Sequence, residues 1–199
     1  MKKLFCVVML LAAMVACGAK AKSVSAMETE VMKEAENTPS AEVVVVADGD
    51  KAKASHIIIS KQDFTLSLYD SDEKLVCRFP VAVGKNYGNK QRKGDMKTPE
   101  GEFSIQQIQP ASDWGHDFGD GKGWIPNCYG NWFIRLKTPP HQGIGIHGTH
   151  APESIGTRAT EGCIRLRNAD LDSLQPMVKV GMPVVILPSD ADREADAEQ

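Results

Sequence analysis

The stretch Phe64-Thr65-Leu66-Ser67-Leu68-Tyr69 alternates large apolar side chains with smaller or more polar ones at a period of two residues. Because successive side chains of a β-strand point to opposite faces, this period predicts a strand that is buried on one side. A second apolar run follows at residues 75–83, and the polar residues 70–74 between the two runs predict the turn of a hairpin.

Similar short runs recur along the rest of the chain. They lie at residues 56–60, 103–108, 132–136, 143–147 and 183–187. Glycine and proline separate them at short intervals, which favours a β-sandwich or barrel-like sheet over a regular alternation of strands and helices. One helix is expected to begin at Asn168, a residue that favours the N-cap, and Pro176 should keep it short. The chain is therefore predicted to be mostly β, with one short helix.

The N-terminal segment has the pattern of an export signal. Lys2 and Lys3 precede an apolar run at residues 4–16, which is too short to span a bilayer as a helix. Small residues directly before Cys17 resemble a bacterial lipoprotein signal, which implies removal of residues 1–16 and attachment of lipid to the Cys17 thiol. Ordinary cleavage after residues 19–21, without an anchor, is the alternative. We expect the protein to be exported to the periplasm and, with its lipid, to be anchored to a membrane.

Composition divides the remainder into a globular part and two appendages. Residues 17–54 contain no aromatic side chain and are rich in Ala, Lys, Glu and Ser, so they are expected to form a flexible tether. Residues 55–188 form the predicted domain, and the acidic residues 189–199 are expected to be a disordered tail. A net charge of −3 over 199 residues offers no basic surface for nucleic acid. We expect a monomer.

Five cysteines leave one natural candidate for a reactive thiol. Cys6 belongs to the signal and Cys17 would be lipidated, so Cys77, Cys128 and Cys163 remain. An odd number in an exported protein indicates a free thiol, with or without a disulfide beside it. A bridge between Cys77 and Cys128 is possible, and the sequence does not decide it.

Two segments carry groups suited to nucleophilic chemistry. They are Gly145-Ile146-His147-Gly148-Thr149-His150 and Thr160-Glu161-Gly162-Cys163-Ile164-Arg165. An imidazole can take the proton of a thiol and hold the resulting thiolate. A glycine before the cysteine lets a carbonyl group approach closely and lets backbone N–H groups point at a developing oxyanion. His147 and Cys163 are therefore suited to acyl transfer through a thioester.

Both segments resemble the catalytic signature of the L,D-transpeptidase family (the YkuD-type domain). That signature is a His-Gly segment followed by Ser/Thr-His-Gly-Cys-Ile/Val-Arg, and here sixteen positions separate His147 from Cys163. Residues 81–85, 97–103 and 181–184 also resemble family segments and occur in the same order. The resemblance covers about residues 55–188 and implies the fold of that catalytic domain.

The resemblance also implies a role in cell-wall biogenesis and cell shape, with a defined mechanism. His147 would accept the thiol proton while a backbone carbonyl holds its other ring nitrogen. Cys163 would then attack a peptidoglycan stem tetrapeptide, release D-Ala and form a thioester. Backbone N–H groups of Gly162 and Cys163 would stabilise the oxyanion, and Gly148 belongs to the same catalytic set. Transfer to an amine of a second stem gives a cross-link, whereas transfer to water gives hydrolysis; no cofactor is implied.

Four further residues are expected to border the bound peptide: Arg165, Thr160, Glu161 and Thr149. Arg165 would steady the loop or a substrate carboxylate, with a surface ion pair as the alternative. The family usually has His where this chain has Glu161. That carboxylate could repel a substrate carboxylate, raise the pKa of the thiol or bind a cationic group, or it could be a solvated loop residue.

Other interpretations stay open. A hydrolase on the same scaffold would use the same groups, and a wall-binding lipoprotein would keep the fold without turnover. A sortase-like transpeptidase also uses His, Cys and Arg, but its arginine lies well beyond the cysteine. His147 and His150 near a cysteine suggest zinc, although no further ligand pair has the usual spacing, so no metal is expected. Trp132 is expected in the core, while Trp114 and Trp124 belong either to the core or to a binding cleft.

Overall fold

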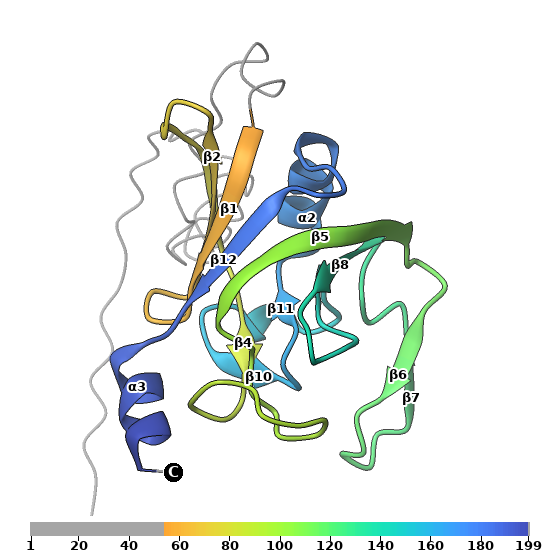
Figure 1. Ribbon diagram of the computed structural model, residues 1–199. Helices are drawn as coiled ribbons and strands as arrows, with labels where there is room; N and C mark the ends of the chain where they lie inside the picture. The colour runs from red at the N-terminus through yellow and green to blue at the C-terminus, as the bar shows by residue number, and fades with distance from the viewer. Residues whose placement is uncertain (1–53, 199) are drawn as a thin grey trace, which may run out of the picture. The chain divides into compact units, whose positions relative to one another are not determined.

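An eight-stranded, strongly curved sheet organises residues 54–198, the part of the chain that the computed structural model describes (Figure 1). In spatial order its strands are β11 (Ile164–Arg165), β9 (Gly145–His147), β8 (Trp132–Lys137), β5 (Gly101–Pro110), β12 (Pro183–Leu187), β1 (Ala54–Ser60), β2 (Thr65–Asp70) and β3 (Leu75–Pro80). Most neighbours are antiparallel, but β11 pairs with β9, and β12 with β1, in parallel. The prediction of a mostly β, barrel-like fold is confirmed.

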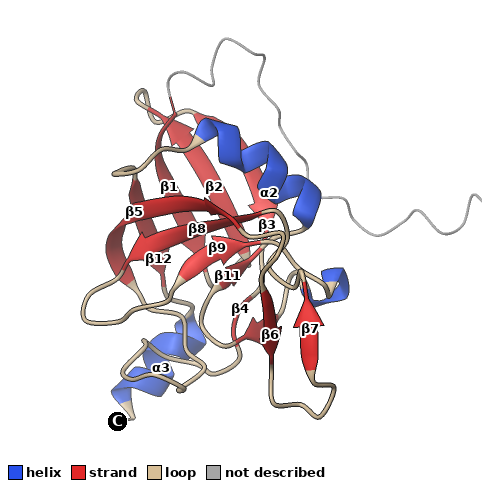
Figure 2. Cartoon of the chain, turned by 90° about the vertical axis from the view of Figure 1, so that its right-hand side faces the viewer, coloured by secondary structure: helices blue, strands red, loops and turns tan. Residues whose placement is uncertain are grey.

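Two small sheets and short helices complete the domain. β4 (Val83–Gly84) pairs with β10 (Arg158–Thr160), and β6 (Gly115–Asp117) pairs with β7 (Trp124–Pro126) as a separate hairpin. The helical segments are η3 (Pro152–Ser154), α2 (Asn168–Leu174), η4 (Gln175–Met177) and α3 (Asp190–Ala197). Figure 2 shows α2 against the curved sheet and the β6–β7 hairpin projecting away from it.

The expected first hairpin forms from β2 and β3. Leu66 lies opposite Phe79 and Leu68 lies opposite Cys77, and all four side chains are buried. These residues join a core that extends across the sheet to Ile164 of β11 and includes Leu171 of α2. The alternation seen in the sequence therefore sets the buried face of the sheet. The second run of the predicted hairpin is divided into β3 and β4, because β4 leaves the main sheet to pair with β10.

The C-terminal residues contradict the expectation of a disordered tail over residues 189–199. Ser189 caps α3 through a reciprocal pair of hydrogen bonds with Asp192, and Asp192 is fully buried. Its carboxylate lies 3.0 Å from the Lys61 ammonium and 2.7 Å from the Arg158 guanidinium. Lys61 is also fully buried and lies 2.5 Å from Glu100. The helix is thus a part of the fold, held by partners far away in the sequence, which composition alone does not reveal.

Several sequence-based expectations fall outside the described residues. These are the signal at residues 1–16, the lipidation of Cys17 and the tether as far as residue 53. Ala54, assigned to the tether, begins β1. No helix within residues 54–198 is both long enough and apolar enough to cross a membrane.

Candidate active site

The two motif segments meet at one edge of the main sheet. β11 lies parallel to β9, with Arg165 opposite His147. β9 pairs antiparallel with β8, where Phe133 is opposite the same histidine. Strand pairing therefore brings Cys163, which directly precedes β11, beside the strand that ends at His147.

The imidazole of His147 has a defined orientation and protonation. The residue is only 4% exposed, and its Nδ1 lies 2.7 Å from the carbonyl oxygen of Gly148. Since a carbonyl oxygen can only accept, Nδ1 carries the hydrogen and Nε2 presents its lone pair. Burial first, and then the charge of Arg165, lower the pKa of His147 to about 3. The ring is therefore neutral at physiological pH and can accept a proton at Nε2.

Two aromatic side chains that the sequence did not single out hold the plane of this ring. Phe133 stacks on His147 with the ring centroids 5.7 Å apart and the planes 7° from parallel. Tyr129 approaches edge-on, with a centroid distance of 4.8 Å and an angle of 71°. Contacts on a face and at an edge together restrict rotation of the imidazole. The signal in the sequence is weak, because only the register of β8 against β9 shows that Phe133 faces the histidine.

The loop after His147 is clamped by the side chain of Asn168. Its Oδ1 accepts from the Thr149 N–H at 2.7 Å, and its Nδ2 donates to the Thr149 carbonyl at 3.1 Å. A Cβ atom at Gly148 would overlap Asn168 Oδ1, so only glycine allows this approach. Asn168 is the first residue of α2 rather than its N-cap, and its amide serves the loop instead. The hydroxyl of Thr149, a residue expected at the substrate, accepts from Ala151 N–H within the same loop.

The Cys163 thiol is half-buried and points toward the neighbouring loop. Its Sγ donates to the Gly143 carbonyl at 3.5 Å, and within residues 54–198 no hydrogen bond joins it to His147. Burial raises the pKa of the thiol, while the Gly145 backbone and the charge of Arg165 act in the opposite direction. At rest the group is therefore a thiol, and it needs a base to become a nucleophile.

The turn before Cys163 is shaped by the Thr160 hydroxyl. This oxygen accepts from the Gly162 N–H at 3.1 Å and donates to the Cys163 carbonyl at 2.6 Å. The expectation that the Gly162 N–H stabilises an oxyanion is therefore wrong, because that hydrogen is already donated. By contrast, the Cys163 N–H donates to no group within the described part of the chain. Gly162 has φ +130°, and a Cβ there would lie 2.7 Å from the carbonyl of Lys97, so the glycine is required by its neighbour as well as by the turn.

Arg165 brings a buried positive charge to the site. The residue is 5% exposed, and its guanidinium donates to the Ser154 hydroxyl at 3.0 Å, while its Nε is buried without a partner. Because Arg165 is buried and no carboxylate within residues 54–198 pairs with it, it does not form the surface ion pair considered from the sequence in this part of the chain. The charge lowers the pKa values of both His147 and Cys163, so it favours a neutral base and a thiolate together.

Glu161, the departure from the family pattern, pairs with the β6–β7 hairpin. Its carboxylate lies 3.4 Å from His116 Nε2, and both side chains are about one-third exposed, at 38% and 34%. The contact connects the nucleophile loop to β6. Glu161 is therefore not simply solvated, and its negative charge also acts to raise the pKa of the Cys163 thiol, one of the effects considered from the sequence.

Two open cavities meet at Cys163. The first, of about 510 Å³, is largely aromatic and includes Trp114, Trp124 and Tyr129. The second, of about 450 Å³, includes the charged side chains Lys90, Lys93 and Glu161. Trp114 and Trp124, which the sequence left undecided, thus border the thiol, whereas Trp132 packs against the core as expected. A peptide can approach the thiol from either side.

The remaining candidates lie apart from this chemistry. Cys77 and Cys128 are both free and buried, so the possible disulfide is not present. Burial raises the pKa of Cys77 to about 12, which leaves its thiol inert. His150 is exposed and packs against Phe118. Residues 54–198 contain no group of three or more His, Cys, Asp or Glu side chains arranged to hold a metal ion.

Comparison with known sequences gives one consistent family. The family model described as the L,D-transpeptidase catalytic domain matches residues 54–186. A Bacillus licheniformis protein named as the L,D-transpeptidase YkuD is 37% identical over 132 residues, which are 66% of this chain and 65% of that protein. Its counterpart in Bacillus subtilis is 34% identical over 133 residues, with the same coverage. The matched region thus spans just under two thirds of these relatives.

Solved structures show the same fold at low sequence identity. An L,D-transpeptidase from Mycobacterium smegmatis has a TM-score of 0.51 at 20% identity, covering 68% of this chain and 59% of that chain. L,D-transpeptidase 3 from Mycobacterium tuberculosis, solved with a faropenem-derived adduct, has a TM-score of 0.52 at 16% identity, covering 67% of this chain and 60% of that chain.

Proposed function

This chain belongs to the L,D-transpeptidase catalytic domain family, and from that premise we propose that it is a cysteine-dependent L,D-transpeptidase acting on peptidoglycan stem peptides. One observation supports the chemistry above all others. A neutral histidine with its Nε2 lone pair free lies on the strand beside a half-buried thiol, and a buried arginine favours the thiolate. This combination suits a thiol nucleophile with a histidine base.

In the first step, His147 Nε2 takes the Cys163 proton as the sulfur forms a bond to the carbonyl carbon of the stem tetrapeptide. This requires the thiol to turn from the Gly143 carbonyl toward the imidazole, a small adjustment of a kind common between free and bound enzymes. The imidazolium then returns the proton to the departing amine of D-Ala. The C–N bond breaks and a thioester remains on Cys163.

Two donors are suited to the oxyanion of this step. The Cys163 N–H is the first, since it has no other acceptor within residues 54–198. The second is the hydroxyl of Tyr129, a residue that lines the aromatic cavity together with Cys163. Burial and the nearby thiols raise the pKa of Tyr129 to about 12, so its hydroxyl stays protonated and able to donate.

In the second step, an amine of a second stem peptide attacks the thioester and gives its proton to His147. The new C–N bond forms as the C–S bond breaks, and the proton returns to the sulfur. The thioester conserves the free energy of the cleaved peptide bond, so no cofactor or nucleotide is needed. Water in place of the amine gives tripeptide only.

Labelling by a carbapenem tests the nucleophile directly, because the β-lactam would leave a stable acyl group on Cys163. Mass spectrometry of the intact protein should show one adduct, and peptide mapping should place it on Cys163. A Cys163→Ala variant should remain unlabelled, whereas a Cys77→Ala variant should label at the wild-type rate. A His147→Gln variant should label about 10²–10⁴-fold more slowly, the usual contribution of a general base. Normal labelling of Cys163→Ala would overturn the assignment.

Incubation with a disaccharide-tetrapeptide distinguishes transfer from hydrolysis. A dimeric muropeptide together with free D-Ala supports transfer, whereas tripeptide and D-Ala alone would identify a carboxypeptidase on the same scaffold. Adduct formation without any turnover would favour a wall-binding protein.

We also propose that the chain acts in the periplasm as a lipoprotein anchored through Cys17. The apolar run and the small residues before Cys17 support this. In cells fed a labelled fatty acid, the wild type should incorporate label and a Cys17→Ser variant should not. Label retained by the variant would refute the anchor.

A further inference from the structure

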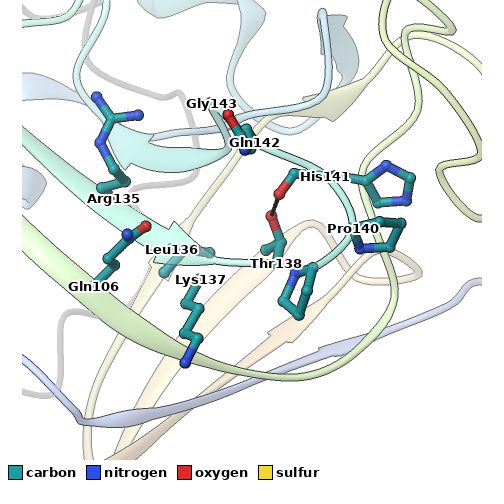
Figure 3. A pocket seen from close by; sticks show the side chains of 10 residues that line it. Gln106, Arg135, Leu136, Lys137, Thr138, Pro140, His141, Gln142 and Gly143 are labelled. Carbon is teal, nitrogen blue, oxygen red and sulfur yellow. Dashed lines mark hydrogen bonds between the residues drawn. The ribbon is translucent and has the colours of Figure 1, made fainter.

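A polar cavity of about 390 Å³ lies behind the loop that touches the nucleophile. It is enclosed by the end of β8, by Gln106 of β5 and by the loop at residues 138–143 (Figure 3). The Thr138 hydroxyl donates to the His141 carbonyl at 3.2 Å, and the His141 N–H donates to the Thr138 carbonyl at 2.7 Å. These bonds fold the loop back beside the strand that carries Arg135 and Lys137, as Figure 3 shows.

This cavity adjoins the catalytic groups through residues that it shares with the two cavities at Cys163. Gly143 lines it and also lines both cavities at Cys163, and the Gly143 carbonyl accepts the thiol hydrogen. Arg135 lines both this cavity and the aromatic one. Its guanidinium lies 5.1 Å from the centre of the Phe133 ring, the ring that stacks on His147. A substrate attached at the thiol can therefore extend across Gly143 to these cations.

The charges in this cavity are unbalanced. No Asp or Glu lines it, while Arg135 and Lys137 both do. Within residues 54–198, Arg135 bonds only to the neutral Gln109 side chain, at 3.4 Å, and neither cation is paired with a carboxylate. Lys90, a buried lysine that lines the second cavity at Cys163, is by contrast paired with Asp95 at 2.7 Å. Arg135 is half-buried and Lys137 is exposed, so the cavity presents positive charge to which an anionic group can bind.

We propose that Arg135 and Lys137 form a subsite that binds a carboxylate of the peptide whose transfer Cys163 catalyses. The guanidinium fork of Arg135 and the ammonium of Lys137 are donors that match the oxygens of a carboxylate. The inference rests on the proposed function, since the peptide is identified by its continuity with the thiol. Donor and acceptor stems both carry carboxylates, so the test separates the two sources.

The test compares a stem tetrapeptide that carries free carboxylates with the same peptide in which one carboxylate at a time is amidated. Each peptide is given to the wild type and to Arg135→Gln and Lys137→Gln variants of the full chain. We expect the wild type to prefer one carboxylate over its amide by about tenfold or more in kcat/KM, the value of a charge-assisted hydrogen bond. In both variants that preference should largely disappear. A merely structural effect of the substitutions would lower turnover of all the peptides equally and keep the preference.

Two arms assign the carboxylate to its source. In the first, only the donor is amidated and hydrolysis is measured without an acceptor. In the second, only the acceptor is amidated and the yield of dimer is measured. A preference that vanishes with Arg135→Gln in either arm supports the subsite and names its ligand. Lys179→Gln, a change of an exposed lysine that lines none of the three cavities, is the matched control and should keep the wild-type preference.

Binding without turnover keeps this inference separable from the proposed function. In a Cys163→Ala background, calorimetry should show tighter binding of the carboxylate peptide than of its amide, and Arg135→Gln should abolish the difference. If that holds while the wild type shows no turnover, the subsite stands and the proposed function fails. Equal binding of both peptides to the parent variant, or an unchanged difference in Arg135→Gln, would overturn the subsite.

Discussion

Replacing the buried Asp192 by Asn should destabilise the domain severely, although the residue takes no part in the chemistry. The substitution keeps the size of the side chain but removes a charge that lies 3.0 Å from the Lys61 ammonium and 2.7 Å from the Arg158 guanidinium. Removal of one partner from a buried ionic network usually costs about 3–5 kcal/mol. At about 2–4 °C per kcal/mol for a domain of this size, the unfolding midpoint should fall by about 6–20 °C.

The pH dependence of this loss follows from the pKa of the carboxyl group. Burial disfavours the ionised form of Asp192, but hydrogen bonds from Ser189 and Gly88 and the contact with Lys61 outweigh it and hold the pKa well below the ordinary value of 3.8. A carboxyl with a lowered pKa stabilises the fold above its ordinary pKa and loses that contribution as the pH falls below it. At neutral pH the free energy of unfolding of the wild type should therefore exceed that of Asp192→Asn by the full amount. Below about pH 4 the difference between the two should become smaller.

Thermal and urea unfolding of the full chain, followed by circular dichroism at pH 7 and at successively lower pH, measure this difference. Asp190→Asn is the matched control, since Asp190 lies in the same helix with 82% of its side chain exposed. The control should leave the midpoint unchanged within error. A midpoint for Asp192→Asn equal to that of the control, or a gap that widens in acid, would refute the account of the C-terminal helix.

Three further substitutions test the active site. Gly162→Ala places a Cβ against the Lys97 carbonyl at a positive φ, so carbapenem acylation of Cys163 should slow at least tenfold even where circular dichroism shows a folded protein; wild-type acylation would refute the steric account. Asn168→Ala frees the loop after the histidine, and crosslinking kcat should fall about tenfold or more while the unfolding midpoint falls by only a few degrees; unchanged kcat would remove its positioning role. Arg165→Gln removes a charge that lowers the pKa of the thiol, so the pH profile of iodoacetamide alkylation should move to higher pH, and a shift to lower pH would contradict the assigned electrostatics.

The fold was largely predictable because its strands bury one face each. The alternation at residues 64–69 and the compact runs elsewhere correspond to strands of the main sheet. The C-terminal helix was not predictable in the same way. Its only apolar side chains are alanines, and its stability depends on Lys61 and Arg158, which lie far from it along the chain. Local composition can indicate that a segment lacks a hydrophobic face, but not that its charges have distant partners.

Some residues of the candidate site could likewise be predicted from the sequence, and others could not. His147 and Cys163 could be identified because their residue types and spacing carry the chemistry. The groups that orient them, Phe133 and Asn168, act through strand register and a side-chain amide, so no motif marks them. The error at Gly162 is instructive in this respect: its N–H was expected to face an oxyanion, but a hydroxyl two residues earlier already accepts it.

Because of the C-terminal helix, the folded domain of this protein extends beyond the region that matches the family. The match to the family model spans residues 54–186, but the buried network continues to Asp192. A protein shortened at residue 186 would keep every residue of the family signature and would still leave the fully buried Lys61 with one acidic partner instead of two. Domain boundaries taken from sequence similarity alone would thus remove Asp192 from the buried ionic network. Gene fusions or domain transplants should extend at least to the end of α3 at Ala197.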